Sequence, residues 1–342
     1  MVGLNVLHQK DALQQGAGGA VEAPGQPVQL PEYLFNENMP SGDASGAGDG
    51  PGDMPITDDM IRNATKELYS RALRKVPEDA KAAIAAAMAT ETSETARQTL
   101  LLQLRSAELS ERTDRFVCSD SGVPTYFVKV GSKAALDCDF KMAIREGYEE
   151  LVETIEPPLL KHVTNPLTLE RGYHGKDMPI VSYDFESGAD YVEMTCSPKA
   201  LGSGRWASLE LFTFPSLEQI ETYILDVAIK AGAQHCPPVI MGVGIGGSFD
   251  HCAGLAKKQT LRPIGEKNPE PILAAMEERL TKAVNSLGFG PMGTGGDTTV
   301  LAVHVDYASG HGFTPVAVCF NCWINRRAKA RLWGDGRVEW SE

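Results

Sequence analysis

Long apolar runs, an excess of basic residues and an even set of closely spaced cysteines are all missing from this sequence. No stretch approaches the roughly 20 consecutive apolar residues that span a bilayer. The start of the chain lacks the basic and then apolar segments of a secretory signal. The 342 residues carry 32 Lys and Arg against 45 Asp and Glu, a formal net charge of −13, which provides no basic surface for a phosphate backbone. We therefore expect a cytoplasmic protein that binds neither membranes nor nucleic acids.

The cysteine content also argues against a protein stabilised by disulfide bonds. There are seven cysteines, an odd number, and they are widely scattered, which argues against a disulfide framework. They are therefore available as ligands or as small buried apolar groups. Apolar residues make up 42% of the chain and charged residues 23%, which is ordinary for a soluble protein with an apolar core.

Composition divides the chain into three predicted segments. Residues 1–55 read as a disordered or extended arm, because 41–52 is a glycine-rich stretch typical of a flexible linker. Residues 56–335 form the predicted folded domain, and 336–342 the C-terminal tail.

Within the folded part, a helical pattern with breaks covers residues 57–111, and strands then alternate with helices. This order predicts a mixed α/β (α+β) fold, with a helical N-terminal part and mixed sheets flanked by helices. The predicted strands are 126–130, 192–195, 209–214, 239–243, 300–305 and 316–320, and the predicted helices after the first part are 140–155, 217–231 and 270–287.

The first motif is Cys118-Ser-Asp-Ser-Gly122, a polar loop between predicted helix and strand. Functional groups concentrate in loops on a rigid scaffold, and Asp120 is placed to contact a substrate hydroxyl. An ordinary Asx turn beside a spectator thiol explains the same letters.

The second motif is Cys236-Pro-Pro, followed by an apolar strand and the glycines of 242–247. Its letters match the dinucleotide fingerprint GxGxxG. The motif lies far from the start of a βαβ unit, and no acidic residue marks the end of a second strand, so we discount that interpretation. Close approach of the backbone to a ligand or to another chain remains an explanation for the glycines.

The third motif is Cys319-Phe-Asn-Cys322, followed by Arg326 and Arg327. A CxxC pair is typical of a redox site, half a zinc site or a cluster ligand. The absence of a second CxxC weakens the zinc interpretation. The two arginines are suited to clamping a carboxylate, and equally to surface salt bridges.

A fourth segment, GFGPMGTGGDTTVLAVH (288–304), places a glycine-rich loop before a strand that carries His304. Such a loop either brings backbone close to a ligand or is an ordinary connection.

Together these segments resemble the α subunits of class I iron–sulfur fumarases and L-tartrate dehydratases, and equally the N-terminal domain of the single-chain class I fumarases. The resemblance covers about residues 57–332. It is strongest in VGIGG (243–247), LAKKQTLRPIGEKNP (255–269), GFGPMGTGGDTT (288–299) and the segment from Cys322 to Arg327.

The resemblance implies that Cys118, Cys236 and Cys322 hold a [4Fe–4S] cluster and that the other four cysteines do not. Thiolates are soft ligands that suit such clusters. The fourth iron would be an open Lewis acid that makes a substrate hydroxyl a better leaving group.

The resemblance also implies a partner and a reaction. A separate β subunit would supply the general base and carboxylate-binding residues, in an α2β2-like assembly with the active site at the interface. The reaction would be reversible dehydration of a small hydroxy (di)carboxylic acid, fumarate hydratase-like. The alternatives are an L-tartrate dehydratase-like or other hydroxy-acid dehydratase and, second, a non-catalytic cluster-binding scaffold.

The expected catalytic residues are Asp120 and His304. His304 matches a histidine found in relatives, and it either orients a substrate or cluster ligand or has a structural role. The expected substrate-binding residues are Ser119, Asp120, Arg205 and Arg326. Ser119 and Met292 replace glutamines of the family, and Arg205 lies where relatives have a more glycine-rich stretch. Buried polar groups discriminate strongly between substrates, so the loss of two amides means that neither fumarate nor tartrate is assigned as the substrate. A bulkier or less polar hydroxy acid is a further candidate.

Overall fold

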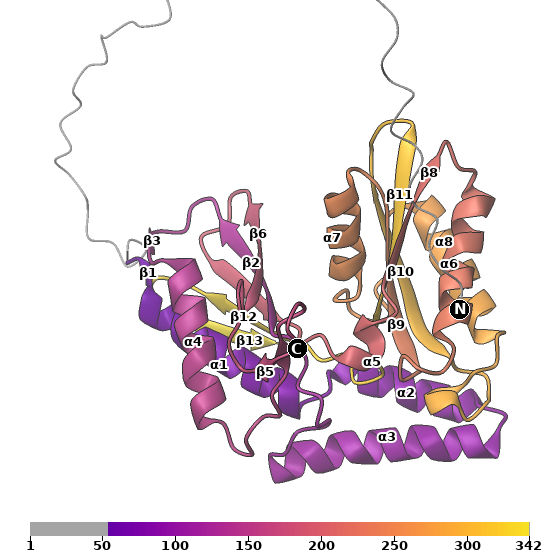
Figure 1. Cartoon of the computed structure of the whole chain (residues 1–342), viewed down its shortest axis with the longest axis horizontal. Coiled ribbons are helices and arrows are strands. Elements are labelled where there is room, and N and C mark those ends of the chain that lie inside the picture. Colours follow the sequence, from indigo (N-terminus) through magenta and orange to yellow (C-terminus); the bar gives the residue numbers. More distant parts are fainter. Residues whose placement is uncertain (1–53, 342) are drawn as a thin grey trace, which may run out of the picture. The chain divides into compact units, whose positions relative to one another are not determined.

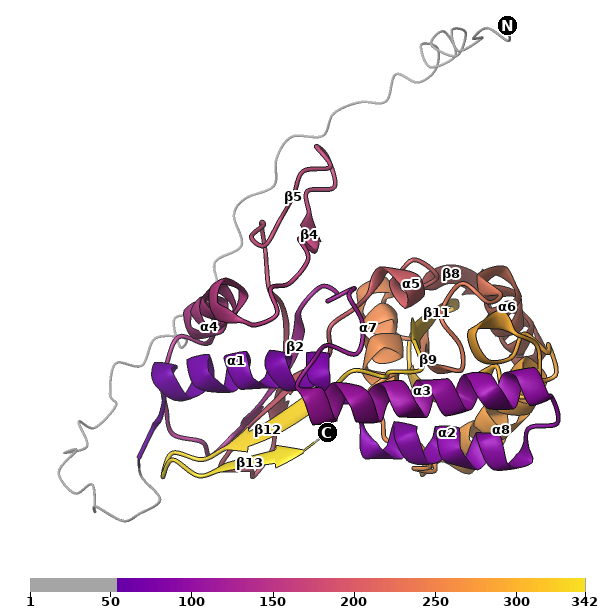
Figure 2. The same cartoon turned by 90° about the horizontal axis from the view of Figure 1, so that it is seen from below.

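Three helices follow a two-residue strand at the start of the part of the chain that the computed structural model describes, residues 54–341 (Figure 1). They are α1 (Asp58–Arg74), α2 (Glu78–Thr90) and α3 (Glu94–Thr113). Figure 2 shows α2 and α3 lying side by side, and their apolar faces share one buried cluster. Most of the predicted arm, residues 1–53, lies outside the described residues.

A five-stranded sheet forms the first core. Its order is β13-β12-β7-β2-β6, and only the β2–β6 pair is parallel. Helices α1 and α4 (Phe140–Thr154) pack with this sheet and contribute to one apolar cluster. The strands are β2 (Thr125–Gly131), β6 (Ile180–Glu186), β7 (Val192–Cys196), β12 (Ala328–Leu332) and β13 (Val338–Ser341).

Strand β13 falls in the segment predicted to be a C-terminal tail. It pairs antiparallel with β12, and alternate residues Val338 and Trp340 pack against the first core. A four-residue strand is too short to show a period in sequence, which explains the difference.

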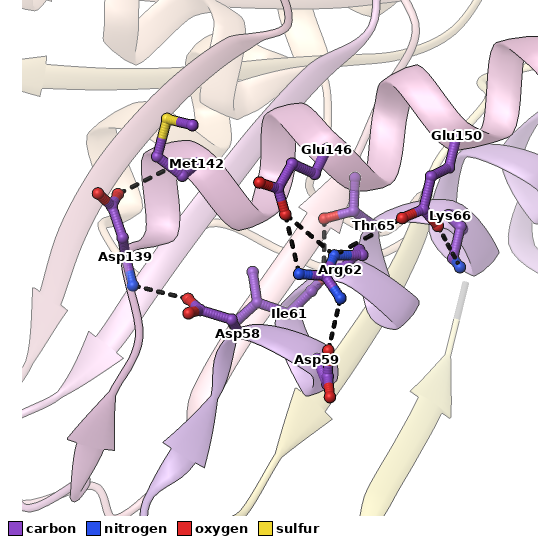
Figure 3. A network of polar contacts seen from close by, with 10 residues as sticks. All are labelled: Asp58, Asp59, Ile61, Arg62, Thr65, Lys66, Asp139, Met142, Glu146 and Glu150. Carbon is purple, nitrogen blue, oxygen red and sulfur yellow. Dashed lines mark hydrogen bonds and ion pairs between the residues drawn. The ribbon is translucent and has the colours of Figure 1, made fainter.

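Ion pairs and a glycine join α1 to α4 (Figure 3). Arg62 donates to Glu146 at 2.8 Å, and Lys66 donates to Glu150 at 2.8 Å. A Cβ atom at Gly147 would lie 2.5 Å from the carbonyl oxygen of Arg62. The two helices can therefore approach closely enough for these short cross-links only because position 147 lacks a side chain.

A four-stranded sheet forms the second core, in the order β10-β9-β11-β8. Strands β9 and β10 are parallel, and β11 runs antiparallel to its neighbours. Helix α7 covers one face and helices α6 and α8 the other (Figure 1). The elements are β8 (Ser208–Thr213), α6 (Leu217–Ala231), β9 (Val239–Gly246), α7 (Phe249–Gln259), α8 (Pro271–Asn285), β10 (Val300–Ala308) and β11 (Phe313–Asn321).

The glycines of β9 serve the packing of α7. A Cβ atom at Gly242 would lie 2.1 Å from the carbonyl oxygen of Ala256, and one at Gly244 would lie 2.2 Å from that of Cys252. The close backbone approach expected from the sequence is real, but the approaching group is a helix of the same chain.

The glycine-rich loop 288–299 also approaches its own chain. A Cβ atom at Gly296 would lie 2.5 Å from that of Ala96 in α3. Asp297 accepts hydrogen bonds from the backbone and hydroxyl of Thr92 between α2 and α3. The loop, with its short 3-10 helix η2 (Pro291–Gly293), therefore fixes the helical pair beside the second sheet.

The remaining elements are short. They are the parallel pair β1 (Ile56–Thr57) and β3 (Leu136–Asp137), the hairpin β4 (Val163–Thr164) and β5 (Arg171–Gly172), and the single-turn helix α5 (Leu201–Gly204). The observed mixture of helices and sheets confirms the predicted fold class.

Candidate active site

Three thiols from distant parts of the sequence gather at one apolar cluster. Cys118 lies in the loop before β2, Cys236 precedes β9 and Cys322 follows β11. All three are partly buried and pack against the cluster that α2 and α3 form with Trp323 and Ile324. The backbone N–H of Trp323 donates to the carbonyl oxygen of Cys236 at 3.2 Å, which holds two of the segments together.

The thiols are also within electrostatic reach of one another. Burial, and then the charges of Cys322, Cys118 and Asp120, raise the pKa of Cys236 to about 11. The thiolate is therefore disfavoured at this position unless a cation compensates for the neighbouring negative charge.

The backbone at Cys236 is held in an uncommon conformation. Its φ is +58°, in the left-handed region that residues other than glycine rarely adopt. The next carbonyl, that of Pro237, accepts from the side chain of Gln103 at 3.2 Å and from the backbone of Met292 at 2.8 Å. Helix α3 and the 288–299 loop therefore fix this segment, and Met292 takes part through its main chain.

The CxxC pair is divided between two clusters. Cys319 packs with Cys252, Ala256 and Ala317 between β11 and α7, whereas Cys322 packs against the helical pair. A redox pair or a zinc half-site needs both thiols at one place, so the structure does not support either interpretation.

The Asp120 loop is tied down at several points. The carboxylate accepts from the backbone N–H of Gly122 at 3.1 Å and from that of Leu201 at 2.9 Å. Arg326 donates to the carbonyl oxygen of Asp120 at 2.7 Å. Gly122 has φ +72°, and a Cβ atom there would lie 2.8 Å from the carbonyl carbon of Lys199. The predicted Asx turn is thus present, and it joins the cysteine loop to α5.

A hollow of about 590 Å³ lies against this loop. Among the described residues that line it, Asp120 is the one acidic residue, whereas the Lys and Arg residues come from several elements. Ser119 and Ser121 also line it. The cationic residues are Lys161, Arg171, Lys199, Arg205 and Lys257. Although the chain is acidic overall, this hollow offers a positive local field that suits an anion.

Two predicted site residues lie elsewhere. Arg326 is 4% exposed and contacts the Asp120 backbone, and it is not among the residues that line the hollow. His304 is 3% exposed, with Nδ1 3.1 Å from the carbonyl oxygen of Gln259 at the end of α7. Burial, followed by the charge of Arg262, lowers the pKa of His304 to about 4, so its ring is neutral at pH 7.

Four cations of the hollow were not singled out by sequence reasoning: Lys161, Arg171, Lys199 and Lys257. Lys257 does fall inside the LAKKQTLRPIGEKNP block, but nothing in that block distinguishes it from Lys258. Within residues 54–341, no three His, Cys, Asp or Glu side chains lie close enough to hold a single metal ion, and no helix there is long and apolar enough to cross a membrane.

Comparison with known proteins agrees with the motifs. A family model described as fumarate hydratase (fumerase) matches residues 62–331. The chain is 35% identical over 286 residues to the putative L(+)-tartrate dehydratase subunit alpha of Methanocaldococcus jannaschii, covering 81% of this chain and 99% of that protein. It is 32% identical over 228 residues to L(+)-tartrate dehydratase subunit alpha of Escherichia coli K12, covering 65% and 74%.

These matches define the class of protein: the chain is a hydro-lyase, an enzyme that adds or removes water. It belongs to the fumarate hydratase (fumerase) family, and the resemblance inferred from the sequence is confirmed.

Proposed function

We propose that this chain is the cluster-carrying α subunit of a hydro-lyase that reversibly dehydrates a small hydroxy (di)carboxylic acid. Cys118, Cys236 and Cys322 are its proposed cluster ligands. The observation that carries the proposal is the gathering of these three thiols beside a hollow lined by Asp120 and several cations.

The residues present fit a [4Fe–4S] cluster. Thiolates are the usual ligands of such clusters, and Cys118, Cys236 and Cys322 pack against one apolar cluster and interact electrostatically. Among residues 54–341, the Ser121 hydroxyl and both ring nitrogens of His235 are buried without a hydrogen-bond partner, next to two of the cysteine segments. When bound, the cluster supplies an iron without a protein thiolate, which is a Lewis acid.

The chain's own residues bind and orient the substrate. The cations of the hollow attract its carboxylates. Asp120 is held rigidly by two backbone N–H groups, and each carboxylate oxygen keeps a further lone pair that can accept the proton of a substrate hydroxyl. Ser119 and Arg205 line the same hollow and are proposed substrate contacts.

Arg326 and His304 are proposed positioning residues. Arg326 holds the Asp120 carbonyl, and His304 holds the last turn of α7, which carries Lys257. Both therefore act on the hollow through other residues.

The relatives are named as α subunits of L(+)-tartrate dehydratase. We infer that this chain likewise works with a β subunit that supplies the base and further carboxylate-binding groups, in a cytoplasmic α2β2-like assembly. L(+)-tartrate and the fumarate–malate pair are the first substrates to test. The cationic hollow favours an enzyme over a non-catalytic scaffold, since a scaffold has no need of an anion site.

The test begins with the cluster. After anaerobic reconstitution, wild type and Cys319→Ser should bind iron and sulfide and absorb as iron–sulfur proteins do, whereas Cys118→Ser should lose most of both. Cys319→Ser is the matched control because it removes a thiol from the same CxxC pair. Colourless wild-type protein without iron would overturn the cluster assignment.

Activity is tested on the reconstituted complex with a β subunit. Dehydration of L(+)-tartrate or hydration of fumarate should require Cys118. A complex that carries the cluster but converts no hydroxy acid would favour the scaffold instead.

A further inference from the structure

Lys257 is a half-buried lysine without an anionic partner. It lies in the last turn of α7 and lines the hollow beside Asp120 and Lys199. Among residues 54–341, no carboxylate lies within ion-pair distance of its ammonium group, which instead lies 5.6 Å from the centre of the Phe127 ring. The next residue, Lys258, is an ordinary exposed lysine that pairs with Asp184 at 2.7 Å.

A second cation increases the cost of this arrangement. Lys199 is directed to the Phe320 carbonyl oxygen and to Asn321 Oδ1, the latter at 3.0 Å. Burial lowers the pKa of Lys257; Cys319 opposes this effect, and the charge of Lys199, a smaller contribution, lowers the pKa further. Within the described residues, neither ammonium group is neutralised by a carboxylate, so the two positive charges repel each other.

The free-energy cost of this unpaired ammonium group indicates that Lys257 has a function. A partly buried charge without a partner is destabilising, and a methionine would cover Phe127 with its apolar stem equally well. Residues that break a local rule in this way are expected at functional sites. The compensation available here is an anion in the hollow, which would pair with Lys257 and relieve its repulsion with Lys199.

We propose that Lys257 binds a carboxylate group of the substrate. This inference rests on the proposed function, because it places that carboxylate in the same hollow as the Asp120 loop. With one carboxylate fixed at Lys257, the remainder of the substrate is oriented within the hollow that Asp120 and Ser119 line.

The experiment uses the full chain and measures the binding of succinate, a dicarboxylate without a hydroxyl group, by titration calorimetry. Lys257→Met should weaken succinate binding about tenfold or more, a loss of about 1.4 kcal/mol per factor of ten. Lys257→Arg should retain part of the affinity because it keeps the charge. The matched control Lys258→Met should bind succinate within about twofold of wild type.

Thermal stability distinguishes a binding role of Lys257 from a purely structural one. If Lys257 binds the substrate, its replacement should not destabilise the protein. Thermal unfolding without ligand should show Lys257→Met as stable as wild type or more stable, because an unpaired charge has been removed. A variant that is less stable and binds succinate normally would overturn the inference, as would a wild type that binds no succinate at millimolar concentration.

Failure of the carboxylate site and failure of the cluster assignment give different results. Iron content is measured on the same samples. If wild type carries the cluster and Lys257→Met binds succinate as wild type does, the carboxylate site is wrong and the cluster stands. If no iron is found and binding still depends on Lys257, the cluster assignment is wrong and the carboxylate site stands.

Discussion

Asp120 illustrates how one side chain can serve both the fold and the chemistry. Its two carboxylate oxygens accept from Gly122 and Leu201, which places the cysteine loop against α5. An asparagine keeps one acceptor, but its amide nitrogen would face a backbone N–H, donor against donor. The carboxylate is therefore required even before any role toward a substrate is considered.

We expect Asp120→Asn to lower kcat/KM by about 100-fold or more, as is typical when a group that handles a proton is lost. It should also cost about 0.5–1.5 kcal/mol of stability, because one of the two backbone donors loses its acceptor. Steady-state kinetics on the reconstituted complex and urea unfolding of the chain measure the two effects. Activity that survives in a variant with the expected stability loss would remove Asp120 from the proposed catalytic role.

At this scale, the sequence predicts a functional residue when the adjacent residues form a recognisable motif with it. Cys118 and Asp120 share one short loop, and Cys236 is marked by two prolines. Arg326 and Lys257 differ, because their roles depend on partners far away in sequence. Arg326 was expected at the substrate, and it is instead hydrogen-bonded to the carbonyl of a residue about 200 positions earlier.

At the scale of elements, the contact between α7 and β9 determines where Lys257 lies. We expect Gly244→Ala to destabilise the protein by about 3 kcal/mol or more, the range of severe overpacking, because the new Cβ atom would lie 2.2 Å from the Cys252 carbonyl oxygen. Displacement of α7 should also weaken anion binding. Urea unfolding and succinate titration measure the two effects.

Gly254→Ala is the matched control, since it lies on α7 itself and a Cβ atom there meets nothing within 4 Å. Alanine in an open helical position should stabilise by about 0.5–1 kcal/mol. Equal effects of the two substitutions would contradict the packing argument.

Sequence patterns predict some of these elements better than others. The predicted helix 217–231 is observed with the same bounds as α6, whose Ser216–Gln219 capping box and following Gly232 mark both ends. Helix α7 is not predicted, because it is short and its buried residues are small, so the glycines before it suggested a ligand or a second chain. The helix that fills the space beside them becomes visible only in three dimensions.

At the scale of the whole molecule, the site draws on both sheets. Cys118 leads into the five-stranded sheet, whereas Cys236 and Cys322 flank strands of the four-stranded sheet. Alternation of strands and helices predicts the fold class, but it carries no information on which ends of which sheets meet. The cationic hollow depends on that meeting, which is why most of its cations could not be predicted from sequence.

The acid stability of the molecule should depend on Glu193, a buried carboxylate in β7. Burial opposes its ionisation, but a hydrogen bond from Arg331 at 2.8 Å and the charges of Lys329 and Lys129 outweigh burial, so its pKa lies below the ordinary value. A carboxyl whose folded pKa is lowered contributes stability above its unfolded pKa of about 4.3, and this contribution is lost as the pH falls through the folded pKa.

We therefore expect Glu193→Gln to be less stable than wild type by about 1–2 kcal/mol at pH 7, with the difference shrinking as the pH falls below about 4. Urea unfolding at several pH values measures this difference. Glu339→Gln, on the exposed edge strand β13, should change stability by less than about 0.5 kcal/mol throughout. A constant difference between wild type and Glu193→Gln from pH 7 to pH 3 would show that Glu193 stabilises the sheet by packing, because only a titrating ion pair across β2, β7 and β12 makes the difference depend on pH.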